Sequence, residues 1–199
     1  QAALGESVGR RLTSALSTYL ASIGETGLIA GLKWDYKLVQ SREVNAFCMP
    51  NGKIVFYEGI MPYCPTADDV AVVMGHEIAH AIARHGNERM SQQSVLNVAG
   101  NVASAIIGVR TGADAQELFN LAYSVGGQYG VLLPFSRKHE LEADEIGLII
   151  MALAGYDVDK APDFWERMSA GTRTSVPEVI STHPSNASRI SAIRKAIPK

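Results

Sequence analysis

Two histidines and a glutamate stand at a spacing suited to metal chemistry, in His76-Glu77-Ile78-Ala79-His80. The motif lies in an apolar stretch compatible with a helix, and residues four apart share one face of a helix. His76 and His80 can therefore aim their imidazoles at one point, with Glu77 close enough to act on a water bound there. This is what a catalytic zinc site needs from a helix: two ligands and a general base. The alternative, a chance motif on a solvated face, is disfavoured by the Val, Met, Ile and Ala residues around it, because a buried Glu or His without a partner is costly.

A catalytic zinc usually has three protein ligands and one position for water, so a third ligand must come from elsewhere in the chain. The form H-E-x-x-H-x-x-G-x-x-H is excluded, because Ala83 and Gly86 stand where its Gly and last His would be, and His85 is one residue short. The remaining candidates are His139, Glu140, Glu142, Asp144, Glu145 and His183.

Glu140 and Asp144 are four residues apart on a predicted helix at 136–155, so they share a face. We predict Glu140 as the third ligand. Asp144 is predicted to accept the ring N–H of a zinc-bound imidazole, which fixes the tautomer of that imidazole. The other interpretation, a charged and solvated helix start, is weaker beside the H-E-x-x-H motif.

Apolar periodicity predicts the elements that position these residues. A capping box at Thr66 and Asp69 starts the helix that carries the motif. Two β-prone runs flanking Asn51-Gly52 predict a hairpin, which is either purely structural or an edge that receives an extended peptide. Residues 92–135 could form a helical cover or a lid. The predicted helices span 4–23, 67–91, 92–109, 115–123, 136–155 and 161–169, with a strand at 33–41, the hairpin at 45–57 and a basic helix ending near 197.

Length and composition predict one domain over residues 1–199. The net charge of −2, without a basic block, excludes nucleic acid as an expected partner. Cys48 and Cys64 could form a disulfide or be two buried, small apolar residues. Because the chain starts at Gln1, we expect a processed N-terminus whose missing segment could have been a signal peptide or a membrane anchor. The longest apolar stretch, 95–109, is too short and interrupted to span a membrane.

Four blocks of the sequence resemble the M48 family of zinc metallopeptidases. They are GHEIAHAIARHGNERMSQ, SRKHELEADEIG, NAFCMPNGKIVFYEGIM and THPSNASRI, which together cover roughly residues 45–190 in the family's order. The resemblance implies an α+β, zincin-like fold, mainly helical, with a small mixed sheet over the active helix. It also implies His76, His80 and Glu140 as ligands, Glu77 as base and Asp144 as their partner. Because no spanning helix is predicted, the chain resembles the small soluble or lipoprotein-type branch of bacterial envelopes.

His183 and Arg189 lie in the last of these blocks. The resemblance implies that His183 lies over the zinc, where it could stabilise the oxyanion of the reaction or occupy the open metal position in a resting state. Arg189 could hold a substrate carbonyl or an acidic group such as Asp144. His85 and His139 are predicted to be surface or packing residues.

The predicted function is that of a zinc endopeptidase with one Zn²⁺ per chain, acting on proteins or peptides in envelope quality control. The predicted location is the cell envelope, periplasmic or lipoprotein-anchored. An alternative is a chaperone-like binder of misfolded proteins whose zinc site is closed by His183. A purely structural zinc is a third possibility, but Glu77 argues against it, since a structural site has no use for a base.

Overall fold

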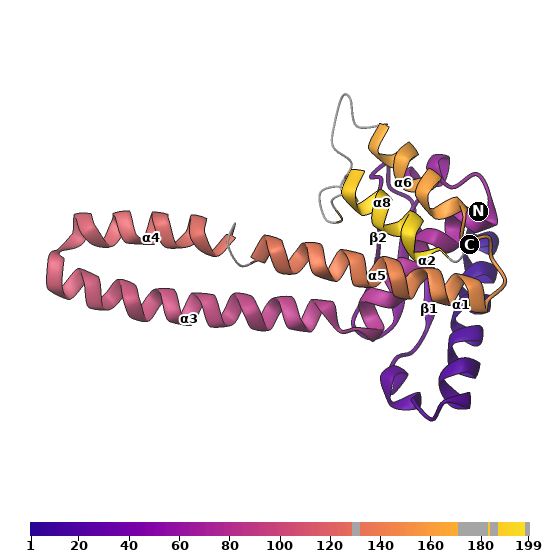
Figure 1. Ribbon diagram of the computed structural model, residues 1–199, viewed down its shortest axis with the longest axis horizontal. Helices are drawn as coiled ribbons and strands as arrows, with labels where there is room; N and C mark the ends of the chain where they lie inside the picture. The colour runs from indigo at the N-terminus through magenta and orange to yellow at the C-terminus, as the bar shows by residue number, and fades with distance from the viewer. Residues whose placement is uncertain (129–131, 171–182, 184–186, 198–199) are drawn as a thin grey trace. The chain divides into compact units, whose positions relative to one another are not determined.

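The fold is described by a computed structural model for residues 1–128, 132–170, 183 and 187–197. The chain divides into two compact units, one formed by Gln1–Arg84 with Glu140–Lys199 and the other by His85–His139. The predicted class, α+β and mainly helical with a small mixed sheet, is confirmed (Figure 1). The organisation as a single domain stays a prediction.

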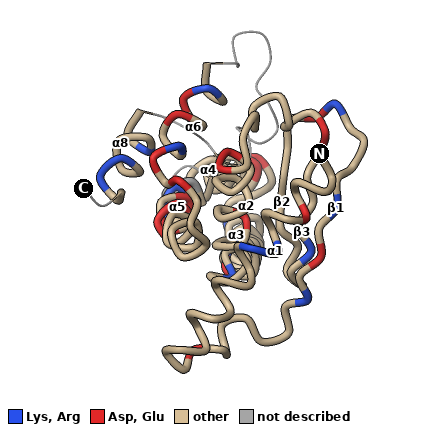
Figure 2. The backbone as a smooth tube through the Cα atoms, turned by 90° about the vertical axis from the view of Figure 1, so that its right-hand side faces the viewer, with Lys and Arg blue, Asp and Glu red and all other residues tan. Residues whose placement is uncertain are grey.

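The first unit contains most of the secondary structure. Its helices are α1 (Ala2–Ser22), α2 (Ala67–Ile82), the part of α5 (Leu133–Leu153) that begins at Glu140, α6 (Lys160–Ala170) and α8 (Ala187–Ala196), with 3₁₀ turns at Thr26–Ile29 and Glu58–Tyr63. The predicted helices at 4–23, 136–155 and 161–169 are confirmed to within a few residues. α6 carries residues of both charges, Lys160 and Arg167 together with Asp163 and Glu166 (Figure 2).

The sheet has three strands, β1 (Asp35–Val39), β2 (Ala46–Cys48) and β3 (Lys53–Tyr57), in the order β1-β3-β2. β2 and β3 pair antiparallel, which confirms the predicted hairpin, and Gly52 in its turn has a φ of 91° that favours glycine. β1 pairs with β3 in parallel. Since β2 has one neighbour, it is an edge strand of the described sheet.

α2 is the central helix of the first unit. Every residue from Asp69 to Ala79 is buried, and the helix contacts α1, α6, β2 and β3. A helix that is buried all round needs its polar groups to be paired. Its N-terminus is closed by the predicted capping box, in which the Thr66 hydroxyl accepts from the Asp69 N–H and the Asp69 carboxylate accepts from the Thr66 N–H.

The predicted continuation of this helix to residue 91 is wrong. α2 ends at Ile82, and Arg84 adopts a left-handed φ of 57° before α3 (His85–Thr111) begins. A left-handed residue interrupts the helical hydrogen bonds and turns the chain. Because neither glycine nor proline stands at position 84, the sequence carries no signal for this break.

The second unit contains α3 and α4 (Ala113–Gly127), which lie side by side as an antiparallel pair (Figure 1). The predicted helices at 92–109 and 115–123 fall within them. Within the described part of the chain, no helix combines the length and apolar character needed to cross a membrane.

The two cysteines are free thiols, with Cys64 buried and Cys48 partly buried. Burial raises the pKa of each thiol to about 12, so both are protonated at neutral pH. Of the two alternatives left open by the sequence, the structure therefore shows small apolar residues and no disulfide.

Candidate metal centre

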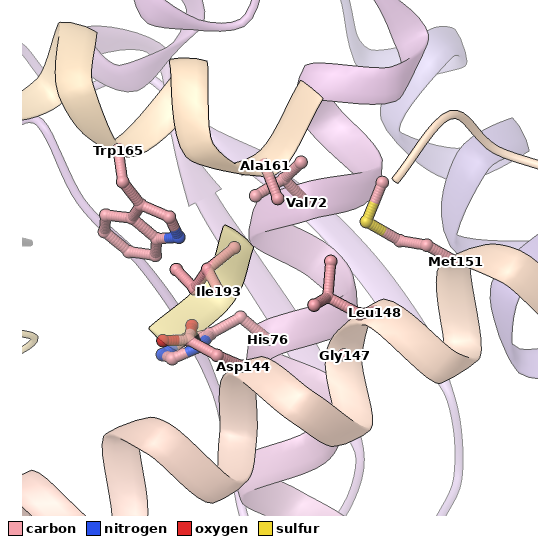
Figure 3. Close-up of a pocket in the computed structure, with 9 residues that line it drawn as sticks. All are labelled: Val72, His76, Asp144, Gly147, Leu148, Met151, Ala161, Trp165 and Ile193. Carbon is pink, nitrogen blue, oxygen red and sulfur yellow. Dashed lines mark ion pairs between the residues drawn. The ribbon is translucent and has the colours of Figure 1, made fainter. Parts of the chain in front are cut away.

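The positions of α2 and α5 are set by two glycines that face each other. A Cβ atom on Gly75 would lie 3.0 Å from the carbonyl oxygen of Gly147, and one on Gly147 would lie 3.0 Å from the backbone nitrogen of His76. The two helix backbones therefore touch, as Figure 3 shows for Gly147 and the segment that carries His76. Asp144 lies one turn before Gly147 on α5, and Glu140 one further turn before it, so this contact brings both carboxylates to the histidines of α2.

Four side chains converge on one point: His76, His80, Glu140 and His183. The Nε2 atoms of His76 and His80 are 3.0 Å apart. The Glu140 carboxylate lies 3.2 Å from His76 Nε2 and 3.3 Å from His80 Nε2. His183 Nδ1 lies 3.0 Å from Glu140 and 3.2 Å from His76 Nε2. All four donor atoms lie within 4.8 Å of one another.

This donor set fits a metal ion. Two unprotonated imidazole nitrogens 3.0 Å apart repel each other unless a proton or a cation lies between them. A tetrahedral ion with bonds of 2.0–2.1 Å to nitrogen and oxygen spaces its donors by about 3.3 Å, close to the separations between the two histidines and Glu140. The group could therefore hold a metal ion.

Asp144 contacts the Nδ1 side of the His76 ring, and Arg189 in turn contacts Asp144. Asp144 lies 2.9 Å from His76 Nδ1, and the two side chains lie next to each other beneath Ile193 (Figure 3). Arg189 donates to both oxygens of Asp144, at 2.6 and 2.8 Å, and its guanidinium lies 4.0 Å from the centre of the Trp165 ring. Of the two partners considered for Arg189, the contact with Asp144 is present, and Arg189 also lies 3.3 Å from Glu140; its role stays a prediction.

Glu77 is buried beside the cluster. One of its oxygens accepts a hydrogen bond of 3.2 Å from the backbone N–H of Cys48 on β2. The other lies 3.4 Å from Nε2 of His183. Glu77 is therefore held at one side while its second oxygen faces the ring of His183.

The buried charges shift several pKa values. Burial raises the pKa of Glu77 above its ordinary value, against the opposing effect of His183 and His76. Although burial opposes it, hydrogen bonds from His183, His76 and His80 hold the pKa of Glu140 well below its usual range. Burial together with a charged His76 lowers the pKa of His80 to about 3. For His76 itself, hydrogen bonds to Asp144 and Glu140 outweigh burial and raise its pKa to about 9.

The other candidates from the sequence lie elsewhere. Glu142 and Glu145 are exposed on α5. His85 and His139 stack on each other within the second unit, with ring centroids 4.3 Å apart, and Glu88 lies 3.1 Å from His139.

Two groups that contact the site residues were not predicted from the sequence. Trp165 packs against both Arg189 and His76, yet in the sequence it is one apolar residue of an amphipathic helix. The Cys48 N–H is a backbone group, so only the nearness of the predicted hairpin to the motif could have suggested it.

Comparison with known proteins shows the family of this chain. The model of peptidase family M48 matches residues 11–197. The chain belongs to this family. The resemblance recognised from its four sequence blocks is therefore confirmed, as is the metallopeptidase class.

Several relatives resemble the chain over most of its length. It is 36% identical over 189 residues to mitochondrial metalloendopeptidase OMA1 of Schizosaccharomyces pombe, covering 94% of this chain and 53% of that protein. It is 31% identical to the human mitochondrial metalloendopeptidase OMA1, covering 86% of this chain and 34% of the relative. A putative beta-barrel assembly-enhancing protease of Vibrio cholerae is 28% identical, over 90% of this chain and 39% of that protein. The chain thus spans about half or less of the length of these relatives.

These matches correct the predicted location. The relatives above 30% identity are named as mitochondrial proteins, whereas the bacterial protein is less similar. The prediction of a cell-envelope location, periplasmic or lipoprotein-anchored, is therefore wrong. The residues of a metal site do not encode the compartment in which a protein works, which is why the motifs could not supply it.

Proposed function

We propose that the chain is the catalytic domain of a zinc endopeptidase that cleaves proteins or peptides. The observation that carries the proposal is the convergence of His76, His80 and Glu140 beside the buried carboxylate of Glu77. Family membership and relatives named metalloendopeptidases support it. Removal of misfolded proteins as the physiological role belongs to the same proposal.

His76, His80 and Glu140 would hold the ion. The nitrogen and carboxylate donors of this set suit zinc. When bound, zinc acts as a Lewis acid toward a substrate carbonyl and lowers the pKa of water. Asp144 accepts the Nδ1 proton of His76, so the Nε2 lone pair of that ring points to the cluster.

Glu77 is the general base of the proposed reaction. Its pKa is raised by burial, which makes its carboxylate a better proton acceptor near neutral pH. It takes a proton from the attacking water and passes that proton to the amine that leaves. The hydrogen bond from the Cys48 N–H holds the carboxylate in place throughout.

β2 would align the substrate. It is an edge strand, and its residue Cys48 contacts Glu77 through the backbone. An extended peptide that adds to this edge by backbone hydrogen bonds would place its carbonyls beside the base.

His183 supports a second candidate function, in which the chain binds misfolded proteins while its metal site stays closed. Nδ1 of His183 lies as close to Glu140 and His76 as these two lie to each other. Such a position suits a fourth ligand that fills the place of water, and Arg189 donates to the carbonyl of His183 at 3.1 Å, which holds the backbone there. A role in stabilising the oxyanion would require His183 to leave this position.

A metal-replacement experiment tests the proposal. Chelator-treated protein is assayed for cleavage of an unfolded protein such as casein, then titrated with zinc. We expect cleavage to vanish on metal removal and to return as one zinc per chain is added. Zinc binding at one per chain without any cleavage would favour the closed, substrate-binding function. Cleavage that persists in protein shown to be free of metal would contradict both functions.

A further inference from the structure

α3 exposes a row of branched aliphatic side chains. Val95, Val98, Val102, Ile106 and Val109 follow one another at intervals of three or four residues, so they form one face of the helix, which we call the α3 face. The exposed fraction of these side chains runs from 51% for Ile106 to 89% for Val109. An uninterrupted row of this kind marks an interaction surface, whereas single exposed aliphatic residues are ordinary.

α4 adds a second row. Leu118, Leu121 and Val125 are also three and four residues apart, and they are 69%, 64% and 49% exposed. This row lies on the side of α4 opposite Gln116 and Tyr123, which contact α3, so it faces away from the α3 face.

The contact between the two helices combines half-buried apolar residues such as Leu96 and Phe119 with a series of small residues on α3. Gly100, Ser104 and Gly108 lie one turn apart on the side of α3 that faces α4. A Cβ atom on Gly100 would lie 2.6 Å from the ring of Tyr123, and one on Gly108 would lie 2.5 Å from the side chain of Gln116. The helices therefore approach as closely as they do only because these residues are small.

Hydrogen bonds complete this contact. The amide of Gln116 donates to the hydroxyl of Ser104 at 3.0 Å, and the hydroxyl of Tyr123 donates to the carbonyl of Leu96 at 3.0 Å. Small residues spaced by four and polar side chains that bond across helices are how helices associate in lipid, where burying aliphatic groups between them brings no gain.

The middle parts of both helices also lack charged residues. No charged residue occurs between Arg89 and Arg110, and none between Glu117 and Arg137. The aliphatic rows are thus free of charge, while arginines stand at both ends of the α3 face, where they could contact phosphate headgroups.

We propose that the α3 face binds a lipid bilayer, with its aliphatic side chains in the interfacial region. Since α3 is not apolar enough to cross a membrane, it lies in the interface, with α4 on its side away from the lipid. A second copy of the chain is the less suitable occupant. Helix seams that pair two chains are flanked by charged residues that fix the partner, whereas the α3 face is flanked by Ser94, Asn101 and Ala105. Lipid binding by this surface does not depend on the peptidase activity.

Flotation with vesicles of pure phosphatidylcholine tests the proposal, because these vesicles carry no net charge. The test variant combines Val98→Asp with Val102→Asp on the α3 face. The matched control combines Asn97→Asp with Asn101→Asp, which adds the same charge at exposed positions outside the face. We expect the unmodified chain and the control to float, and the partition coefficient of the test variant to fall about tenfold or more, since a buried carboxylate is strongly disfavoured in lipid.

Three results would overturn the proposal. The first is that the unmodified chain does not float. The second is that the control loses as much binding as the test variant. The third is a dimer in lipid-free sedimentation that the test variant splits, without flotation, which would assign the surface to a second copy of the chain. Helix content is compared by circular dichroism, and if the aspartates reduce it, Val98→Ser with Val102→Ser takes their place with a smaller expected loss.

Discussion

Gly147 of α5 lies against the backbone of His76 on α2, so closely that a Cβ atom would come within 3.0 Å of the His76 nitrogen. This contact joins the two halves of the site, because Asp144 and Glu140 lie one and two turns before Gly147 on α5. The geometry of the metal centre therefore depends on a residue that has no side chain to offer it.

Replacing Gly147 with Ala should separate the helices. We expect the free energy of unfolding to fall by about 1–3 kcal/mol from overpacking, and zinc affinity to fall as well, because Glu140 moves with α5. Chemical denaturation and a zinc titration measure the two effects. Gly126→Ala on α4 is the control, since a Cβ atom there meets open space and alanine favours a helix. Equal behaviour of the two variants would contradict the role of the contact.

Asp144→Asn should weaken the site in two ways. It removes the charge of the carboxylate that accepts two hydrogen bonds from the buried guanidinium of Arg189 and leaves Glu140, at 3.3 Å, as a charged neighbour; we expect a loss of about 3 kcal/mol of stability. It also replaces the charged acceptor of the His76 Nδ1–H with a neutral amide, and a loss of about 10–100-fold in metal affinity is typical when such a partner is changed. Thermal unfolding and zinc competition measure both. Glu145→Gln, at the exposed neighbouring position, should change stability by less than about 0.5 kcal/mol; similar losses in both variants would refute the assignment.

The contacts of Asp144 with Arg189 and His76 predict that the metal-free protein loses stability as the pH falls below about 4. Although burial opposes it, hydrogen bonds from Arg189 and His76 lower the pKa of Asp144 below its ordinary value. A lowered folded-state pKa adds stability above the unfolded-state value of about 3.9, and this stability is lost as the pH falls through the folded value. Unfolding at several pH values below 5 should therefore show a shallower slope in Asp144→Asn. An unchanged slope would count against the pairing.

Zinc affinity should rise with pH over an unusually wide range. In the folded, metal-free protein the pKa of His76 is raised to about 9, and a protonated imidazole must release a proton before it can bind the ion. We expect affinity to climb by up to about tenfold per pH unit below pH 9 and then to level off. Competition with a chelator of known protonation constants measures this. A plateau that begins near pH 6.5, the ordinary pKa of histidine, would show that Asp144 and Glu140 do not act as described.

His183→Ala separates the two candidate roles of this residue. If His183 fills the position of water, its removal should raise the rate of casein cleavage. If it stabilises the oxyanion, the rate should fall while zinc stays bound. His85→Ala in the second unit is a control that removes a histidine outside the cluster. A higher or a lower rate would each assign one of these roles to His183. An unchanged rate of cleavage would contradict both roles.

Local spacing was sufficient to predict much of the site. The interval of four residues between His76 and His80, and again between Glu140 and Asp144, determines which groups share a helix face, and the structure brings both faces together. Two β-prone runs flanking Asn51-Gly52 likewise predicted the hairpin of β2 and β3.

Features set by tertiary contact could not be predicted in this way. The left-handed turn at Arg84 has no glycine or proline to mark it, so α2 was predicted too long. The parallel pairing of β1 with β3 joins segments whose own sequences do not specify a partner. Trp165 reaches His76 and Arg189 only because α6 packs beside α2.

The central claim is that Glu77 is the base of a zinc peptidase whose ligands are His76, His80 and Glu140. The most direct test is Glu77→Gln, assayed in parallel for bound zinc and for casein cleavage. Because Glu77 transfers protons and is not among the residues proposed to bind the ion, zinc should remain at one per chain while cleavage falls by about 10²–10⁴-fold. Cleavage at the unmodified rate with zinc bound would contradict the claim.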